Sequence, residues 1–123
     1  MIDFEKVLTF GASGTIGSYG DCGVRPSHAE CDITNADAVE EIVASVKPSA
    51  IIHLAGATDM ARTEAEPAYA YELNVRGTYN IARSARAHGA VMVYASTSRV
   101  FKGDKPEPYT EDDSPEPETH YGR

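Results

Sequence analysis

A glycine-rich segment near the start of the chain has the residue types and the spacing to hold phosphate groups. Gly11, Gly14 and Gly17 recur at every third position, directly after Val7–Phe10, an apolar run typical of a buried parallel strand. Glycine permits a tight turn and lets backbone N–H groups approach a pyrophosphate without a Cβ in the way. Alone, such a turn is a weak indication, but after a strand it favours dinucleotide binding over a turn that is merely tight.

Cys22, His28 and Cys31 form a second group whose residue types could do chemistry, as ligands of a metal ion. The group supplies only three ligands, lacks a paired Cys-x-x-Cys and has no second cluster beside it. We therefore expect small buried thiols and a surface histidine, and no metal site. Two cysteines also fit a reducing compartment better than a disulfide scaffold, which would contain more of them.

His53 is the only titratable residue of the apolar run 50–55. No second histidine or aspartate in the sequence is placed to pair with it. We expect a neutral, hydrogen-bonded imidazole in the core rather than a catalytic base.

The periodicity of the apolar residues predicts five elements that must position these side chains. The first helix has Thr34 and Asp37 placed as an acidic capping box, and the second helix ends at Gly89. In chain order we expect a buried strand at 7–10, a helix at 34–47, a buried strand at 50–55, a helix at 67–88 and a buried strand at 91–95.

The alternation of strands and helices predicts an α/β fold with a doubly wound, Rossmann-like parallel sheet, which three strands leave incomplete. Only fourteen residues separate Gly17 from Asp32, too few for a full crossover helix and a second strand. We therefore expect a first crossover shortened to a turn after the glycine-rich loop. Open α/β sheets bind ligands at the carboxyl ends of their strands, so the site is expected at that edge.

The charge balance excludes several classes of partner. The sequence has 11 Lys and Arg against 19 Asp and Glu, a formal net charge of −8 at pH 7, so neither nucleic acid nor an anionic membrane is expected. No apolar stretch approaches the ~20 residues of a membrane span, and the first residues lack the features of a signal peptide, so we expect a cytoplasmic protein. Residues 104–118 hold seven acidic residues and four prolines, which predicts a solvated, poorly ordered acidic loop.

An ordered set of motifs spreads along nearly the whole chain from Lys6 onward. After the GxxGxxG segment, its members are Thr58, Glu64-Ala65-Glu66-Pro67, Asn74-Val75-x-Gly77-Thr78-x-Asn80, Ser96-Thr97-x-x-Val100-Phe101-x-Gly103, Pro108-Tyr109-Thr110-Glu111 and Tyr121-Gly122-Arg123. The glycine spacing resembles that of the extended short-chain dehydrogenase/reductases. The order of the motifs resembles one branch of them, the dTDP-4-dehydrorhamnose reductases and related sugar-nucleotide reductases and epimerases. The ordered set is far more specific than any single motif.

The resemblance implies hydride transfer between NAD(P)H and a keto-sugar nucleotide. Thr97 would then hydrogen-bond the substrate carbonyl, and Tyr121 would donate its proton as the hydride arrives. Judged without the family, Thr97 would be a hydroxyl that caps a turn at a strand end. Tyr121 would be a surface ring in an acidic loop.

The resemblance also implies a set of residues that contact the cofactor, NADP or NAD. Asn74 would in addition shape the active site through polar contacts, and Thr58 would face the nicotinamide or the substrate. Independently of the family, Gly77 costs about 1 kcal/mol against Ala in a helix, so we expect it to serve close packing of the helix on a strand. The implied cofactor-binding residues are Gly11, Ser13, Gly14, Thr15, Ile16, Gly17, Asp32, Ile33, Ala55, Gly56, Ala57 and Asn74.

The choice between NAD and NADP stays open in the sequence. Counting from Gly11 nominates Asp32 as the acidic residue that binds the ribose hydroxyls of NAD. The segment Asp32-Ile33-Thr34 is more similar to the family's adenine-contacting segment, and we prefer that alignment. Arg25 is an alternative partner for the 2′-phosphate of NADP.

One element of the family's site has no counterpart in the chain. The family's tyrosine is followed four residues later by a lysine, which here would occupy position 125, beyond Arg123. We therefore predict that residues 1–123 are the N-terminal, cofactor-binding portion of a longer enzyme and are inactive alone.

A sugar-nucleotide epimerase or dehydratase remains open as an alternative to the reductase, and so do two functions of other classes. The first is a non-catalytic regulatory subunit on the same fold, as the regulatory subunit of methionine adenosyltransferase is within this branch. The shortened segment after Gly17 favours it, whereas Thr97 and Tyr121 favour the enzyme. The second is a short protein that forms a homodimer through its exposed sheet edge.

Overall fold

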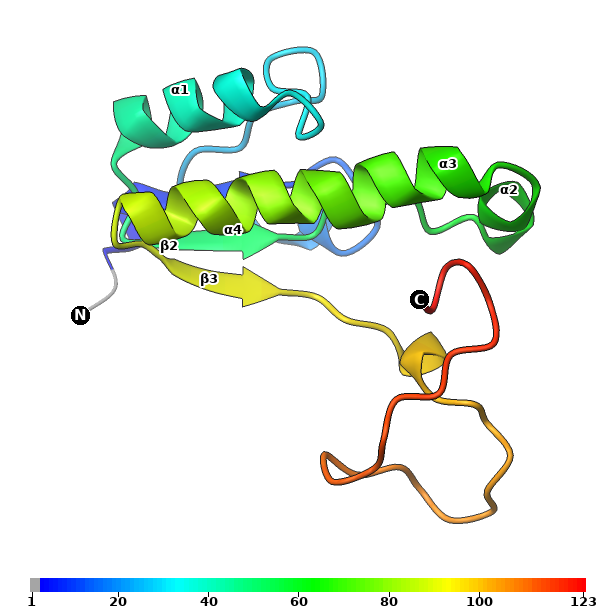
Figure 1. The fold of residues 1–123 in the computed structure, drawn as a ribbon. Helices are drawn as coiled ribbons and strands as arrows, with labels where there is room; N and C mark the ends of the chain where they lie inside the picture. The colour runs from blue at the N-terminus through cyan, green and yellow to red at the C-terminus, as the bar shows by residue number, and fades with distance from the viewer. Residues whose placement is uncertain (1–2) are drawn as a thin grey trace.

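The computed structural model describes residues 3–123 and has a three-stranded parallel sheet at its centre (Figure 1). The strands, which lie in the order β1-β2-β3, are β1 (Val7–Phe10), β2 (Ala50–His53) and β3 (Val91–Tyr94). Their register places Leu8 opposite Ile51, and Ile51 opposite Met92. The parallel sheet predicted from the apolar runs is confirmed, and β2 and β3 end before the predicted boundaries.

Two long helical stretches follow β1 and β2 in the chain. The helices are α1 (Ala36–Val46), α2 (Met60–Ala65), α3 (Pro67–Ala70) and α4 (Thr78–Ala87), and a π-helical segment, η3 (Tyr71–Gly77), joins α3 to α4. The predicted helix at 67–88 is therefore one continuous rod with a π-helical middle, and α2 is an element that the sequence pattern did not predict. None of the helices in residues 3–123 has the length and the apolar character needed to cross a membrane.

The start of α1 differs from the predicted capping box. Asn35, not Thr34, is the cap, because its Oδ1 accepts hydrogen bonds from the N–H groups of Asp37 at 3.1 Å and Ala38 at 3.2 Å. The hydroxyl of Thr34 donates instead to the carboxylate of Asp32 at 2.8 Å. The prediction was wrong by one residue, because the helix begins at Ala36 and the side-chain oxygen of Asn35 is the one placed to accept from its first N–H groups.

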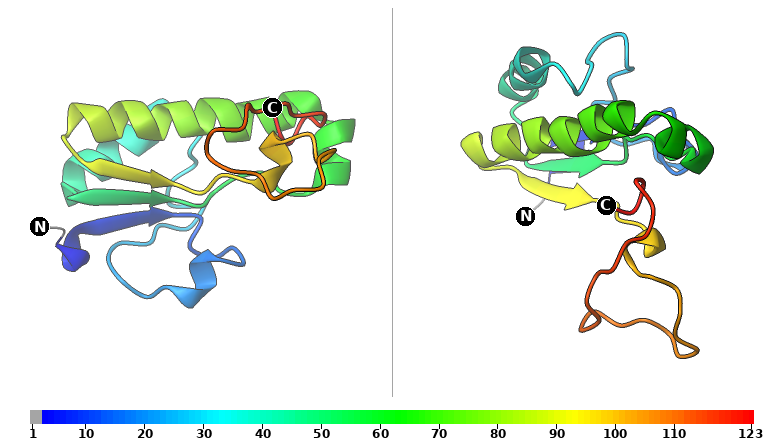
Figure 2. Two further views of the ribbon diagram at one scale, coloured as in Figure 1. Left: turned by 90° about the horizontal axis from the view of Figure 1, so that it is seen from below. Right: turned by 45° about the vertical axis from the view of Figure 1, so that its right-hand side comes forward.

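Helices α1 and α4 cover the same face of the sheet, as the three views agree (Figures 1 and 2). Glu40 of α1 ties the two helices together by accepting hydrogen bonds from Ser84 and His88 of α4, each at 2.6 Å. The core lies between these helices and the sheet and consists of Leu8, Phe10, Cys31, Ile33, Val39, Val43, Ile51, Ile81 and Ala85.

The opposite face of the sheet has no helix over it in the described part of the chain (Figure 2). Val91 and Val93 of β3 point to that face and are 57% and 53% exposed. The prediction of a buried third strand is therefore wrong in burial, although the strand itself is present. The apolar run of β3 marks a surface that residues 3–123 do not cover.

The first crossover is shortened, as predicted. In place of a helix and a full strand it has a three-residue 3₁₀ turn, Gly17–Tyr19, and a single parallel bridge between Leu8 and Val24. Two hydrogen bonds make this bridge, from Val24 N–H to the carbonyl of Val7 at 2.8 Å and from Thr9 N–H to the carbonyl of Val24 at 2.9 Å.

The segment after β3 returns to the carboxyl ends of the strands. Residues 104–118 contain neither helix nor strand, as expected of the acidic loop, but they make specific contacts. Lys105 pairs with the carboxylate of Asp113 at 2.6 Å, and the rings of Phe101 and Tyr109 stack with centroids 4.4 Å apart. This folding brings the end of the chain back beside α2 (Figure 1).

Candidate functional site

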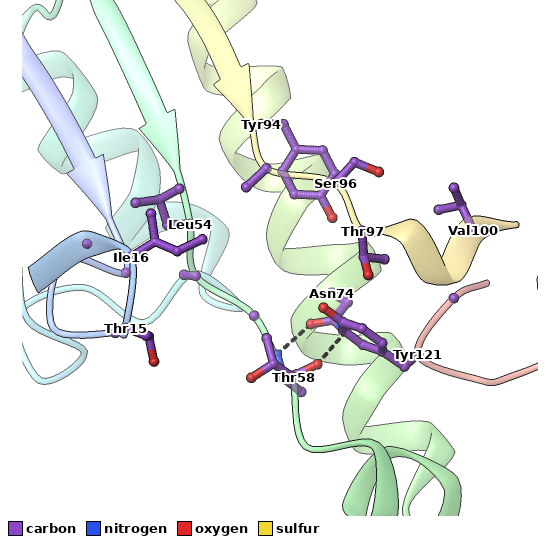
Figure 3. A pocket seen from close by; sticks show the side chains of 18 of the residues that line it. Thr15, Ile16, Leu54, Thr58, Asn74, Tyr94, Ser96, Thr97, Val100 and Tyr121 are labelled. Atoms are coloured by element: carbon purple, nitrogen blue, oxygen red, sulfur yellow. Dashed lines mark hydrogen bonds between the residues drawn. The ribbon is translucent and has the colours of Figure 1, made fainter. Parts of the chain in front are cut away.

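A cavity of about 410 Å³ lies where the strands end, between the glycine-rich loop, the segment after β2 and the end of the chain (Figure 3). Most of the predicted site residues line it: Gly11, Gly14, Thr15, Ile16, Gly17, Ala55, Gly56, Ala57, Thr58, Asn74, Thr97 and Tyr121. A second cavity of about 230 Å³ shares part of the loop and adds Ser13 and Ile33. Asp32 lines neither cavity.

The glycine-rich loop is shaped by backbone contacts that leave no room for a side chain at Gly11 or Gly17. Gly11 has φ +82°, and a Cβ there would collide with the backbone nitrogen of Ala55. A Cβ on Gly17 would collide with the carbonyl oxygen of Gly11, whereas one on Gly14 would have only that oxygen near it, at 3.3 Å. Ile16 is 67% exposed at the rim of the cavity. Bare backbone beside an uncovered apolar side chain suits the close approach of a dinucleotide.

Asn74 connects the π-helical segment to the loop that follows β2. Its Oδ1 accepts a hydrogen bond from Ala57 N–H at 2.7 Å, and its Nδ2 donates to the Ala57 carbonyl at 3.0 Å (Figure 3). Asn74 is therefore not an exposed helix asparagine, and it holds the wall of the cavity at Ala57. A π-helical segment inside an α-helix is frequent at functional sites, and here it carries the one side chain that ties the helix to this loop.

Thr97 and Tyr121 reach the same cavity from different parts of the chain (Figure 3). The Oγ1 of Thr97 accepts a hydrogen bond from Arg99 N–H at 3.2 Å, which caps the turn Ser98–Val100 and leaves the hydroxyl proton free to be donated. The position of Tyr121 is fixed through the preceding residue, because the N–H of His120 donates a hydrogen bond to Glu64 Oε1 of α2 at 2.6 Å.

His53 lies behind the cavity, at the end of β2. Its Nε2 makes a 2.8 Å hydrogen bond with Thr78 Oγ1, and its ring stacks on Tyr94 with centroids 5.1 Å apart. Burial lowers the pKa of His53 to about 4, so the expected neutral form is confirmed. The expected full set of hydrogen bonds is not, because Nδ1 is buried without a partner among the described residues.

The segment 32–34 is fastened from both sides. The carboxylate of Asp32 accepts hydrogen bonds from Thr34 N–H at 2.9 Å and from its hydroxyl, which hold the pKa of Asp32 below its usual value. Asn80 donates from Nδ2 to the carbonyls of Ile33 at 3.0 Å and Thr34 at 3.2 Å. Gly77 packs against the Ile33 side chain, where a Cβ would approach within 2.7 Å. The close packing predicted at Gly77 is thus against this segment rather than against a strand.

Cys22, His28 and Cys31 do not gather into a ligand set, and no group of three or more metal-ligating side chains occurs among the described residues. Cys31 is buried, and burial together with the charge of Asp32 raises the pKa of its thiol. Cys31 and the exposed His28 line the smaller cavity.

Sequence reasoning missed several residues of the two cavities. In the larger cavity these are Leu54, Val75, Tyr94, Ala95, Ser96, Val100, Gly122 and Arg123, and in the smaller one Phe10, Pro26, His28, Cys31 and Leu73. A signal existed for some of them. Leu54, Ala95 and Ser96 follow β2 and β3 within two residues, at the edge where the topology predicted the ligand.

Comparisons with known proteins agree with this geometry. The chain is similar to a dTDP-4-dehydrorhamnose reductase from Bacillus anthracis str. Ames, solved in complex with NADP, with a TM-score of 0.92 and 35% identity over 96% of this chain and 45% of that one. Among curated proteins it is 40% identical to a dTDP-4-dehydrorhamnose reductase of Aggregatibacter actinomycetemcomitans, over 77% of this chain and 32% of that protein.

The chain is also 33% identical to methionine adenosyltransferase 2 subunit beta of Rattus norvegicus, over 99% of this chain and 41% of that protein. It thus spans less than half the length of these relatives. The family described as "RmlD substrate binding domain" matches residues 5–123. The predicted resemblance is confirmed, and the chain belongs to the RmlD substrate-binding-domain family, with the fold of the dTDP-4-dehydrorhamnose reductases.

Proposed function

We propose that residues 1–123 form the dinucleotide-binding portion of an NAD(P)-dependent reductase that acts on a keto-sugar nucleotide of the dTDP-4-dehydrorhamnose type. The observation that carries this proposal is the larger cavity, in which the glycine-rich loop, Thr97 and Tyr121 meet. The relative from Bacillus anthracis, whose NADP complex shares 35% identity with this chain, supports the same cofactor class.

Three parts of the chain bind the dinucleotide in this proposal. The N–H groups of the glycine-rich loop bind the pyrophosphate, and Ala55, Gly56 and Ala57 line the wall along which the dinucleotide lies. A bound NAD(P)H supplies the hydride. Asn74 orients this wall through its two bonds to Ala57.

Thr97 and Tyr121 act on the substrate in this proposal. The Oγ1 of Thr97 accepts a hydrogen bond from Arg99 N–H, and the hydroxyl proton of Thr97 is donated to the substrate carbonyl. Tyr121 donates the proton that the carbonyl oxygen needs when it becomes a hydroxyl. Thr58, exposed at the mouth of the cavity, contacts the substrate.

Calorimetric titration of the 123-residue chain with NADP⁺ and NAD⁺ tests the cofactor part of this proposal. We expect binding of at least one dinucleotide, and its loss when a side chain is placed on the loop by Gly17→Val. Gly20→Val, which changes a glycine with an extended backbone whose Cβ would have only the Gly17 carbonyl oxygen near it, at 3.8 Å, is the control expected to bind normally. Residues 1–123 do not include the family's lysine, so we expect binding without turnover of a keto-sugar nucleotide. Failure of the wild-type chain to bind either dinucleotide would contradict the proposal.

A regulatory role is the second candidate function. It is favoured by the relatives named methionine adenosyltransferase 2 subunit beta, which match 99% of this chain at 33% identity. In that case the chain would bind a methionine adenosyltransferase catalytic subunit, and Tyr121→Phe would leave that binding unchanged. Light scattering of a mixture of the two proteins distinguishes this role from the reductase, for which no complex is expected.

A further inference from the structure

The glycine-rich loop of this chain lacks the helix that normally follows such a loop in this type of fold. A helix that starts at the loop favours bound phosphate through its free N–H groups and its dipole. Here the chain makes only the three-residue turn Gly17–Tyr19, with one further bond from Ser18 N–H to the Gly14 carbonyl at 2.9 Å. The dipole of a single turn is small, so a substitute for its positive potential is needed if phosphate is to bind.

The guanidinium of Arg25 contacts the backbone of the glycine-rich loop. Its Nη2 donates to the carbonyl of Gly17 at 2.6 Å and to the carbonyl of Ala12 at 3.1 Å. In a longer helix the Gly17 carbonyl would accept a hydrogen bond from a backbone N–H four residues later. The Gly17 carbonyl here accepts Gly20 N–H at 3.1 Å as well as Arg25, whereas the Ala12 carbonyl has Arg25 as its only donor among the described residues.

The charge of Arg25 is not neutralised locally. No carboxylate among residues 3–123 forms an ion pair with it, although the sequence has a net charge of −8. Its guanidinium is half-buried, where a charge is screened less than on the surface. The charge of Arg25 is therefore available to attract an anion bound at the loop.

The hydrogen bond to Ala12 also orients the loop. The C=O and N–H of a trans peptide point in opposite directions, so the N–H of Ser13 points away from Arg25. Ser13 lines the smaller cavity, and no described residue accepts a hydrogen bond from its N–H. Arg25 thus fixes a free N–H donor within the cavity wall.

We propose that Arg25 replaces the missing first helix in its two functions at the glycine-rich loop. It holds the glycine-rich loop in its binding conformation and supplies the positive charge that favours the diphosphate of a dinucleotide. The inference rests on the proposed function, and it differs from a role in binding the 2′-phosphate, since Nη2 is engaged by the loop carbonyls.

The test compares Arg25→Gln and Arg25→Lys with wild type by calorimetric binding of NADP⁺, NAD⁺, ADP-ribose and adenosine. Arg86→Gln, on the exposed side of α4, is the matched control for loss of one positive charge. We expect Arg25→Gln to weaken NAD⁺, NADP⁺ and ADP-ribose alike, by about five- to thirtyfold, the upper part of the range for a charge at a helix terminus, which applies to partly buried sites. Arg25→Gln should bind adenosine, which has no diphosphate, with an affinity within about twofold of that of wild type. For the three diphosphate ligands, the affinity of Arg25→Lys should lie between those of wild type and Arg25→Gln.

The other outcomes separate the alternatives. Equal losses for adenosine and ADP-ribose mean that Arg25 only supports the fold, and unchanged binding of all ligands means that it does neither; both results overturn the inference. A loss confined to NADP⁺ assigns Arg25 to the 2′-phosphate and also overturns it. If wild type binds none of the dinucleotides, the proposed function itself fails. If circular dichroism shows that Arg25→Gln does not fold, Arg25→Lys is used for the test instead. This variant keeps the positive charge and removes the two hydrogen bonds from Nη2 to the carbonyls of Ala12 and Gly17.

Discussion

Asn74 pairs with the backbone of Ala57 through both of its amide groups, with a 2.7 Å bond to the oxygen and a 3.0 Å bond from the nitrogen. The side chain thus satisfies both polar groups of one residue, as a neighbouring strand would. Ala57 is buried just beyond the end of β2, where the sheet offers it no partner. The helix therefore controls the geometry of the cavity wall, although it lies outside the sheet.

Asn74→Ala should lower both stability and dinucleotide affinity. The substitution leaves the N–H and C=O of Ala57 unpaired in a part-buried site, which costs about 1–3 kcal/mol in the free energy of unfolding. Urea unfolding measures this loss. Arg76→Ala, which removes only an exposed ion pair with Glu72, is the control, with an expected change below about 0.5 kcal/mol. Equal effects of the two substitutions would show that the Ala57 bonds contribute nothing.

Gly11 and Gly89 offer a matched pair that separates backbone conformation from crowding. Both have positive φ, +82° and +68°, but only at Gly11 would a Cβ meet neighbouring backbone atoms. Gly89→Ala should therefore cost about 1 kcal/mol, the cost of a left-handed conformation, in the free energy of unfolding. Gly11→Ala should cost distinctly more and abolish dinucleotide binding. Thermal unfolding and calorimetry check both effects, and similar costs at the two positions would contradict the crowding argument.

The sequence predicted best where local chemistry and tertiary structure agree. The run Val7–Phe10 is recovered at its predicted bounds, because a glycine with positive φ ends it in any packing. The π-helical segment Tyr71–Gly77 escaped prediction, because the apolar period of an α-helix hardly changes across one π turn. Helix α2 was missed although Asp59, whose side chain accepts a hydrogen bond from Arg62 N–H, carried a local cap signal.

The sequence predicted most of the residues that line the candidate site, but not the contacts that hold those residues in place. Motif order gave residues that do line one cavity, because motifs that follow parallel strands meet at one sheet edge. The contacts that hold them were not predictable, since they join side chains to backbone far away in the sequence. Asn80 on the Ile33 carbonyl and Glu64 on His120 N–H are two such contacts. Backbone N–H and C=O groups carry no sequence signal, so only the structure reveals these contacts.

The contact between Gly77 and Ile33 predicts a strong coupling between two substitutions. Gly77→Ala pushes a methyl group against the Ile33 side chain, so it should destabilise the chain by about 1–3 kcal/mol despite the better helix propensity of alanine. In the background of Ile33→Ala, which removes the colliding atoms, the same substitution should become neutral or stabilising by up to about 1 kcal/mol. A double-mutant cycle from urea unfolding measures the coupling. An additive pair would contradict this account of why a glycine stands in the middle of the helix.

His53 makes stability depend on pH in a defined window. Burial lowers its pKa in the folded chain to about 4, so between the ordinary value of 6.5 and about 4 the unfolded chain binds a proton that the folded chain does not. The contribution of the neutral imidazole to the free energy of unfolding is fully present above pH 6.5 and is lost as the pH falls. At pH 4 the loss amounts to about 3 kcal/mol. Unfolding free energies measured from pH 7 to pH 4 should therefore fall more steeply for wild type than for His53→Gln.

The glutamine variant has no titrating group at this position and keeps an amide that can still bond Thr78. Lowered carboxylate pKa values, such as that of Glu40, add their own loss of stability at low pH, but they act in both proteins and cancel in the difference. His120→Gln is the control, because His120 is exposed and its only bond to Glu64 is from its backbone N–H. That variant should follow the wild-type curve. Parallel curves for wild type and His53→Gln would mean that the buried imidazole accepts its proton without unfolding, through the free Nδ1.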